Sequence, residues 1–314
     1  MMPRPLLLGI VGDSGSGKTT LTRGLVRILG EVQATHIAGD DYQRFDREQR
    51  AELGVTPLDP EANHLDVFEQ HLLHLRSREP VLKPVYRHQG GTFEASEYVR
   101  PTDFTIVEGM LGFHTAGMRD AFDVRVFLDP PEELRRRWKV QRDCSRRGYT
   151  TDGVLEELDR RESDAERYVR PQRRYADIVV TFAPGDRDDE HLDVKLWLRP
   201  RLIHPALSAV LEERPGAIPM EQEGDDLVLG VRGTISTEHS EAIQEVIWER
   251  MEFANHLRTQ RLGEFTIGTS LHRSETLAIA QLLVLYQAVT GRAAIALGGS
   301  TESRTPQTTP PPAA

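Results

Sequence analysis

The chain is poor in cysteine and in long hydrophobic runs. Its 314 residues include one cysteine, Cys144, which excludes an intrachain disulfide and a metal site built from cysteines. The apolar segment 277–289 contains Gln281 and Gln287 and is expected to be too short to cross a bilayer. The apolar segment 6–11 is only as long as a strand and leads into a glycine-rich loop, so no signal peptide is expected. We therefore expect a cytoplasmic protein.

Positive charge is also scarce relative to negative charge. The chain has 39 Lys and Arg residues against 49 Asp and Glu residues, a net charge of -10. Such an acidic balance disfavours general binding to nucleic acids or to anionic membranes. We expect neither as a partner. The hydrophobic share of 38% is ordinary for a globular protein.

A glycine-rich loop carries the strongest signal in the sequence. Residues 12–19 satisfy the pattern G-x-x-x-x-G-K-[ST], with an apolar strand expected before them and an amphipathic helix after them. The glycines allow backbone N–H groups to point at a phosphate, and the helix N-terminus adds positive potential. The residues expected to bind ATP are Gly12, Asp13, Ser14, Gly15, Ser16, Gly17, Lys18, Thr19 and Thr20.

Within this loop, Lys18 can reach the β- and γ-phosphates, and the Thr19 hydroxyl can bind Mg²⁺. The sequence contains no N-K-x-D motif of the kind that selects guanine. The loop alone leaves transport ATPases, helicases and small-molecule kinases open.

The first half of the chain predicts strands alternating with helices, which is typical of a mostly parallel sheet covered on both faces. The expected strands are 6–11, 35–38, 104–107, 124–128 and 178–182. One helix is expected from Lys18 to Gly30, and another through Arg142 with Asp129 as its cap. Further on, a strand is expected at 227–231 and helices at 240–253 and 275–289.

Two acidic residues end predicted strands. Asp40 comes directly after 35–38, where a carboxylate can orient an acceptor hydroxyl and accept its proton; capping the next helix is the structural alternative. Arg47 follows closely and can hold a phosphate. Glu108 ends 104–107 and can bind Mg²⁺, or it is simply a strand-end carboxylate.

A basic helix is expected around 135–147. Runs of charge are usually solvated faces, but Lys139 and Arg142 are three residues apart, and Arg142 and Arg146 are four apart, so they share one face. In an acidic protein such a face is suited to closing over a polyanionic substrate.

In this order the segments resemble the phosphoribulokinase/uridine kinase family along nearly the whole chain. The resemblance is carried by segments 12–19, 40–47, 58–63, 83–88, 107–109, 138–143, 147–150 and 170–177. Segments 198–200 and 203–205 resemble the longer plant and cyanobacterial members, and short uridine kinases lack such an extension. The implied fold is α/β: a P-loop kinase core over 1–194 with a mostly parallel sheet flanked by helices, and a C-terminal α+β extension over 195–298. The Pro-, Ser- and Thr-rich segment 299–314 is expected to be a disordered tail.

The resemblance implies MgATP-dependent phosphorylation of ribulose 5-phosphate to ribulose 1,5-bisphosphate, the reaction that feeds carbon dioxide fixation in the Calvin cycle, and possible homodimers. It implies catalytic roles for Lys18, Asp40, Glu108 and Lys139, with Asp40 as the base. Thr19 and Glu108 would hold the metal ion. The implied substrate-binding residues are Gln43, Arg47, Tyr86, His88, Arg142, Asp143 and Arg147.

Two features depart from the family pattern. Gln43 occupies the place of a histidine beside the sugar phosphate, which implies weaker affinity or a different acceptor. The cysteines that plant members carry in the loop and before the Asp-Asp-Tyr motif are absent, so that regulatory disulfide cannot form. Cys144, beside Asp143, is expected to be inert, and a reactive role is the alternative.

The alternatives are a kinase of another sugar phosphate or of a nucleoside, and a catalytically weak nucleotide-binding regulator. Intact Lys18, Thr19, Asp40 and Glu108 disfavour the last.

Overall fold

A computed structural model describes residues 3–185, 188–200 and 220–298. The predicted tail 299–314 lies outside the described residues.

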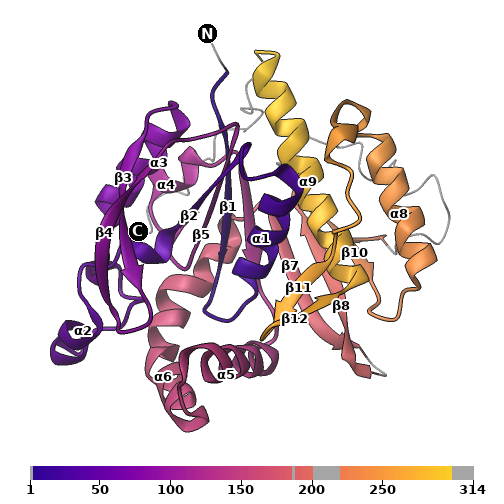
Figure 1. The fold of residues 1–314 in the computed structure, drawn as a ribbon. Helices are drawn as coiled ribbons and strands as arrows, with labels where there is room; N and C mark the ends of the chain where they lie inside the picture. Colours follow the sequence, from indigo (N-terminus) through magenta and orange to yellow (C-terminus); the bar gives the residue numbers. More distant parts are fainter. Residues whose placement is uncertain (1–2, 186–187, 201–219, 299–314) are drawn as a thin grey trace, which may run out of the picture.

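An eight-stranded sheet with the order β2-β5-β1-β6-β7-β8-β10-β9 runs through the molecule (Figure 1). Five neighbouring strands pair in parallel: β2 (Ala34–Ala38), β5 (Phe104–Gly109), β1 (Leu6–Gly12), β6 (Val124–Leu128) and β7 (Ile178–Gly185). Three antiparallel strands continue the sheet: β8 (Asp188–Leu198), β10 (Asp226–Val231) and β9 (Met220–Glu223). The predicted α/β fold with a mostly parallel sheet is confirmed.

Helices cover both faces of the sheet because the central strand is apolar on both sides. Leu6, Leu8 and Ile10 of β1 belong to one hydrophobic cluster, and Leu7 and Val11 belong to the other. The first cluster includes residues of α1 (Lys18–Leu29), α8 (Thr237–Glu249) and α9 (Glu275–Ala296). The second includes residues of α3 (Leu65–Arg76) and α4 (Ala116–Ala121). Because alternate residues of β1 point to opposite faces of the sheet, its apolar side chains are covered by helices on both faces.

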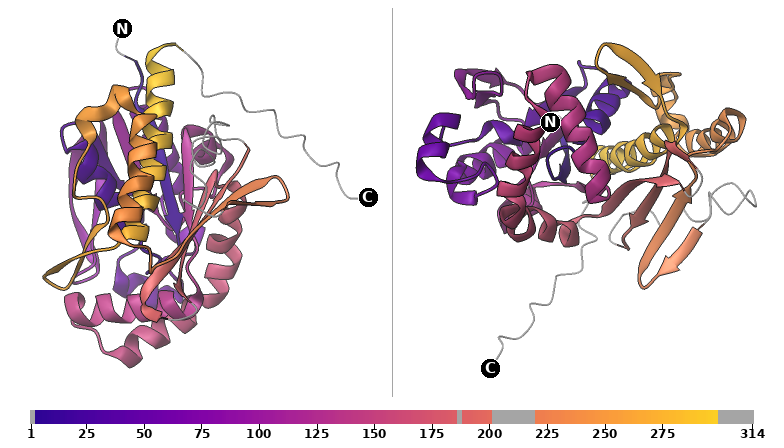
Figure 2. Two further views of the ribbon diagram at one scale, coloured as in Figure 1. Left: turned by 90° about the vertical axis from the view of Figure 1, so that its right-hand side faces the viewer. Right: turned by 90° about the horizontal axis from the view of Figure 1, so that it is seen from below.

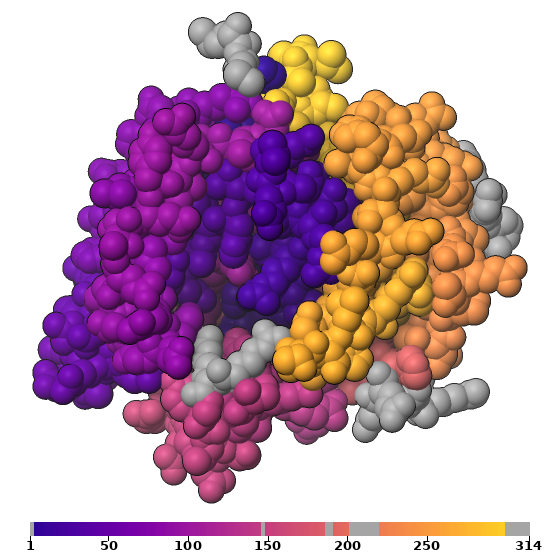
Figure 3. Space-filling model, in the orientation of Figure 1, coloured from indigo at the N-terminus to yellow at the C-terminus, as the bar shows by residue number. Residues whose placement is uncertain are grey.

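The remaining elements surround the carboxyl ends of the parallel strands or flank the sheet. Figure 1 shows α5 (Glu132–Arg147) and α6 (Thr151–Asp164) across one end of the sheet, and the space-filling view shows them as the lower rim of a hollowed front face (Figure 3). Two hairpins are β3 (Val81–Arg87) with β4 (Thr92–Val99), and β11 (Glu264–Ile267) with β12 (Ser270–Arg273). The short helices are η1 (Gly39–Asp41), α2 (Arg47–Leu53), η2 (Pro60–Ala62), η3 (Ala165–Val169), η4 (Arg170–Tyr175) and η5 (Glu252–Leu257).

The sequence placed some helix ends wrongly. Asp129 does not cap α5: the cap position is Pro131, and the Asp129 carboxylate instead accepts a hydrogen bond of 2.8 Å from Arg173. The basic helix expected to continue to Arg147 does so. The helix expected at 240–253 begins earlier, at Thr237, because the Ser236 side chain caps it, and it ends at Glu249 before η5.

The segment expected to be too short for a membrane span is part of a longer helix. α9 has 22 residues and is apolar enough to cross a membrane by length and composition, but 78% of its most apolar window is buried inside the protein. It packs beside α1, α8 and β1 (Figures 1 and 2). The expectation about its length was wrong because a helix buried on all sides carries no polar face to mark its extent.

The division of the chain at residue 194 stays a prediction. β8 spans this position, and one hydrophobic cluster joins β1 and α1 with α8 and α9. The C-terminal elements thus share a core and a sheet with the N-terminal ones.

Replacing Gly24 in α1 by alanine should destabilise the protein, although alanine usually favours a helix by roughly 0.5–1 kcal/mol. A Cβ atom at Gly24 would lie 2.1 Å from Nε2 of Gln281, whose Oε1 accepts a hydrogen bond from Gly263 N at 2.8 Å. We expect Gly24→Ala to lower the free energy of unfolding by about 1–3 kcal/mol, measured by urea denaturation. Gln281→Ala in the same chain should relieve the clash; a more stable Gly24→Ala single variant would contradict this packing.

Candidate active site

A cavity of about 160 Å³ lies where the phosphate loop, the segments that follow β2 and β5, and helices α5 and α6 meet. Its walls contain most of the residues that the sequence predicted for substrate, metal and catalysis. Those that line it are Lys18, Thr19, Asp40, Gln43, Arg47, Tyr86, His88, Glu108, Lys139, Arg142 and Asp143. Thr20 is exposed and does not line it, and the Arg147 side chain lies outside the described parts.

The glycine loop is pressed directly against α5. Gly15 and Gly17 have φ values of 87° and 94°, which favour glycine. A Cβ atom on Gly15 would lie 2.9 Å from Cβ of Lys139, so the absence of a side chain allows the close approach. The Lys18 ammonium donates to the carbonyls of Gly12 and Asp13 at 2.8 and 2.9 Å, and burial lowers its pKa. The loop therefore holds the Lys18 ammonium on two of its own carbonyl oxygens.

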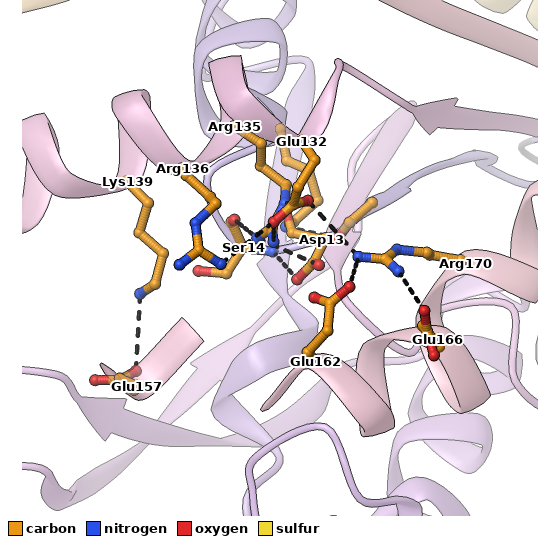
Figure 4. Close-up of polar contacts among 12 residues, drawn as sticks. Asp13, Ser14, Glu132, Arg135, Arg136, Lys139, Glu157, Glu162, Glu166 and Arg170 are labelled. Carbon is orange, nitrogen blue, oxygen red and sulfur yellow. Dashed lines mark hydrogen bonds and ion pairs between the residues drawn. The ribbon is translucent and has the colours of Figure 1, made fainter. Parts of the chain in front are cut away.

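Ion pairs fasten the same loop to α5 (Figure 4). Arg135 donates to the Ser14 carbonyl at 2.8 Å and lies 3.3 Å from the Asp13 carboxylate. Glu132 binds Arg135 through both oxygens at 2.6 and 2.8 Å. Arg170 of η4 contacts Glu132 at 3.6 Å, so the network extends from the loop through α5 to η4.

Asp40 stands at the end of β2, inside η1. Its Oδ1 accepts a hydrogen bond of 2.9 Å from Met110 N. Enclosure away from bulk water raises the pKa of Asp40, although the nearby Lys18 acts in the opposite direction. The neighbouring Asp41 carboxylate accepts a hydrogen bond of 2.5 Å from the Lys83 ammonium. Asp40 is thus the carboxylate with raised proton affinity in the cavity wall.

Glu108 ends β5 and is held by a histidine that the sequence did not single out. Its Oε1 lies 3.0 Å from Nε2 of His36, and its buried Oε2 has no hydrogen-bond partner among the described residues. Burial would raise the pKa of Glu108, but His36 and, more weakly, Lys18 and Thr19 lower it below its ordinary value.

The oxygen donors of Glu108 and Thr19 suit Mg²⁺. Within the described ranges, no group of three or more His, Cys, Asp or Glu residues could hold a metal by itself.

An aspartate of α5 itself pairs with the basic residues on one face of this helix. Lys139 is only 2% exposed and donates to Asp143 at 2.8 Å, and Arg142 binds the other oxygen of Asp143 at 2.8 Å. Burial lowers the pKa of Lys139. Although burial opposes it, the pairing with Arg142 and Lys139 lowers the pKa of Asp143 to about 2. Asp143 therefore orients the two cations whose face the spacing predicted.

The predicted acceptor-binding residues are held by one another. The Gln43 Oε1 accepts a hydrogen bond of 2.7 Å from Arg50, and its Nε2 donates to Asn63 at 3.3 Å. The Arg47 guanidinium donates to the His88 carbonyl at 2.7 Å. The Tyr86 hydroxyl accepts from Arg50 at 2.7 Å.

Sequence reasoning missed several cavity residues. Among them are Arg50, Tyr149, Glu157 and Arg161. Arg50 could have been found, because it lies three residues after Arg47 and so shares its helix face. Arg161 lies among many other charged residues of α6, so no local sequence pattern distinguishes it as a cavity residue.

Comparison with known proteins agrees with this geometry. The model of the family described as "Phosphoribulokinase / Uridine kinase family" matches residues 7–187. The chain belongs to this family. The phosphoribulokinase of Synechocystis sp. is 37% identical over 199 residues, which are 62% of this chain and 60% of that protein. The uridine kinase of Leuconostoc citreum is 35% identical, over 56% of this chain and 87% of that protein.

Among solved structures, phosphoribulokinase from Rhodobacter spheroides matches with a TM-score of 0.56 and 20% identity, over 80% of this chain and 98% of that one. This likeness shows the fold. The chain spans 60% of the length of the Synechocystis phosphoribulokinase and 54% of that from Mesembryanthemum crystallinum, which is 32% identical over 61% of this chain. The family model ends at residue 187, so it covers the phosphate loop, η1 and α5 but not β8 to α9.

Replacing Asp143 by asparagine should destabilise this family member. The variant removes the carboxylate that Lys139 and Arg142 share and leaves Lys139 only the longer pair of 3.7 Å with Glu157, so we expect the free energy of unfolding at pH 7 to fall by about 2–4 kcal/mol. The pKa of about 2, below the ordinary 3.8, means that the carboxylate stabilises the fold above about pH 4, and this contribution is lost as pH falls through about 2.

Urea denaturation at several pH values between 7 and 3 measures the difference in the free energy of unfolding between Asp143→Asn and the unaltered chain. Asp159→Asn, which removes an exposed pair with Arg136, is the control and should cost under about 1 kcal/mol. Equal stability of Asp143→Asn and the unaltered chain at pH 7 would contradict the role given to Asp143.

Proposed function

We propose that this chain transfers the γ-phosphoryl group of ATP to a hydroxyl of ribulose 5-phosphate and so forms ribulose 1,5-bisphosphate. The observation that carries the proposal is the single cavity in which Lys18 and Thr19, the Asp40 carboxylate, and Lys139 with Arg142 meet. This combination supplies a phosphate site, a proton acceptor and cations for the transferring group. The choice of acceptor is supported by the names of the plant and cyanobacterial relatives.

Asp40 would orient the acceptor hydroxyl and receive its proton. The raised pKa of Asp40 makes this carboxylate a better acceptor for the hydroxyl proton than an ordinary aspartate. A primary alcohol is still far less acidic than a carboxylic acid, so full deprotonation before transfer is unfavourable. Positioning and charge neutralisation would therefore dominate, with the proton moving late.

The basic residues would hold the phosphates from two sides. Lys18 would leave the carbonyls of Gly12 and Asp13 for phosphate oxygens. Arg142 lies 3.5 Å from the Ser14 hydroxyl and so faces the loop from α5. Lys139, oriented by Asp143, would neutralise charge on the group in transit.

Thr19 and Glu108 would hold Mg²⁺ through their oxygens. The fit rests on the unpartnered Glu108 Oε2 among described residues and on the hydrogen bond with His36 that fixes the other oxygen. When bound, Mg²⁺ would neutralise negative charge on the β- and γ-phosphates.

Steady-state kinetics with MgATP and a panel of acceptors tests the proposal. We expect the highest kcat/KM with ribulose 5-phosphate, with the bisphosphate product identified by mass spectrometry. Turnover of uridine with none of ribulose 5-phosphate would contradict the proposal and would favour the uridine kinase branch of the family.

Asp40→Asn should separate activity from stability. Loss of the base is expected to lower kcat by at least about 10²-fold, with a small change in the KM for ATP. Enclosure raises the pKa of Asp40 above its value in the unfolded chain. Ionisation of Asp40 therefore destabilises the fold as pH rises through this raised pKa. The neutral asparagine should therefore keep or raise the Tm at pH 7. Unaltered kcat would show that Asp40 is not the base.

A further inference from the structure

Asp13 puts a buried negative charge into the phosphate loop. Its side chain is 8% exposed, and its Oδ1 accepts a hydrogen bond of 2.6 Å from Ser14 N. Its Oδ2 is also buried and forms no hydrogen bond within the described part of the chain. The charges of Asp13 and Lys18 cancel within segment 12–19, so the side chains of the loop alone offer no net attraction to an anion.

Arg135 of α5 faces the Asp13 carboxylate (Figure 4). Its Nη1 lies 3.3 Å from the Asp13 Oδ2 and donates to the Ser14 carbonyl at 2.8 Å. Both side chains of the pair are buried, so water screens little of the attraction between them. Asp13 and Arg135 do not line the cavity, whereas Ser14, Lys18 and Thr19 do. The pair therefore stands outside the space that a ligand would fill.

Glu132 holds Arg135 in place without cancelling all of its charge. Glu132 binds Arg135 through both carboxylate oxygens, at 2.6 and 2.8 Å. The Glu132 side chain is 41% exposed and also lies 3.6 Å from Arg170 and 3.8 Å from Arg136. Because water and two further arginines share the charge of Glu132, the positive charge of Arg135 remains available to Asp13.

We propose that Arg135 is a positioning residue of the nucleotide site: it neutralises the Asp13 carboxylate and holds it on α5, which leaves the phosphate loop with a net positive charge. The proposal rests on the proposed function, because it concerns the ATP that the same reaction consumes. Without Arg135, the Asp13 carboxylate would repel phosphate groups and compete with them for Lys18. Asp13 already acts on Lys18, whose pKa is lowered by burial while the charges of Asp40, Glu108 and Asp13 act in the opposite direction.

Three variants test the proposal, with the Kd for MgADP measured by titration calorimetry. Asp13→Asn keeps the oxygen that accepts from Ser14 N but removes the negative charge, so it should bind MgADP roughly 3- to 10-fold more tightly. Arg135→Gln leaves the Asp13 charge uncompensated and should weaken binding about 10-fold. The double variant Asp13→Asn with Arg135→Gln removes both charges and should bind within about twofold of the unaltered chain.

Glu166→Gln is the matched control. The Glu166 side chain is 67% exposed and contacts Arg170 at 3.4 Å, at the outer end of the same network. The variant removes the same charge as Asp13→Asn from a solvated position and should leave the Kd for MgADP within about twofold of the unaltered chain. Arg135→Lys keeps the positive charge and should retain most of the affinity that Arg135→Gln loses. In every variant the KM for ribulose 5-phosphate should change less than the Kd for MgADP.

Breaking a buried ion pair is destabilising, so the Tm of each variant is measured beside its Kd. If Arg135→Gln does not fold, Asp13→Asn still decides: the proposal is wrong if this variant binds MgADP no more tightly than the unaltered chain. A double variant as weak as Arg135→Gln would show that Arg135 acts only by holding the Ser14 carbonyl, and this result also contradicts the proposal.

These binding measurements need no acceptor, so they separate the role of Arg135 from the proposed function. If the affinities for MgADP follow the charges but ribulose 5-phosphate is not turned over, only the proposed function fails. If ribulose 5-phosphate is turned over and all variants bind MgADP within about twofold of the unaltered chain, only the role given to Arg135 fails.

Discussion

Positive charge is gathered and buried around one cavity, and most of it is balanced by carboxylates of the protein itself. Lys139 is paired with Asp143, and Lys83 with Asp41. The first pair lies within α5, whereas the second fixes the β3–β4 hairpin against η1 at the end of β2, and Arg135 with Asp13 fixes α5 against the phosphate loop. Lys18 and Arg50 lie outside this internal balance among the described residues. The buried cations of the described residues therefore divide into those paired with carboxylates of the protein and these two, which are not.

Much of the fold could be predicted because its signals are local. The strand expected at 124–128 is β6 without change, and the loop and helix that follow β1 are fixed by glycines and an apolar face. The order of β8, β10 and β9 could not be predicted, because strand pairing is set by contacts distant in sequence. Asp129 shows the same limit for a single residue. The local sequence predicts that its side chain caps α5, but the carboxylate binds Arg173, which lies 44 residues further along the chain.

The site divides in the same way. Motif spacing identified candidate groups such as Lys18, Asp40 and Glu108, which the structure places around one cavity, because each lies in or directly after a predicted strand or loop. It could not show which group neutralises or orients which, because those partners meet only in the folded protein. His36 on Glu108 and Arg50 on Gln43 are examples. Gln43 read alone indicated a weakened phosphate site, whereas its contact with Arg50 shows that a positive charge stands beside it.

The proposed reaction requires the buried cations of this cavity to face the anionic groups of two substrates across Asp40. A crystal structure with Mg²⁺, a non-hydrolysable ATP analogue and ribulose 5-phosphate would show whether they do. The Lys18 ammonium should leave the carbonyls of Gly12 and Asp13 for phosphate oxygens, and a hydroxyl of the sugar should lie on Asp40. A sugar phosphate bound with none of its hydroxyls near Asp40 would refute this arrangement.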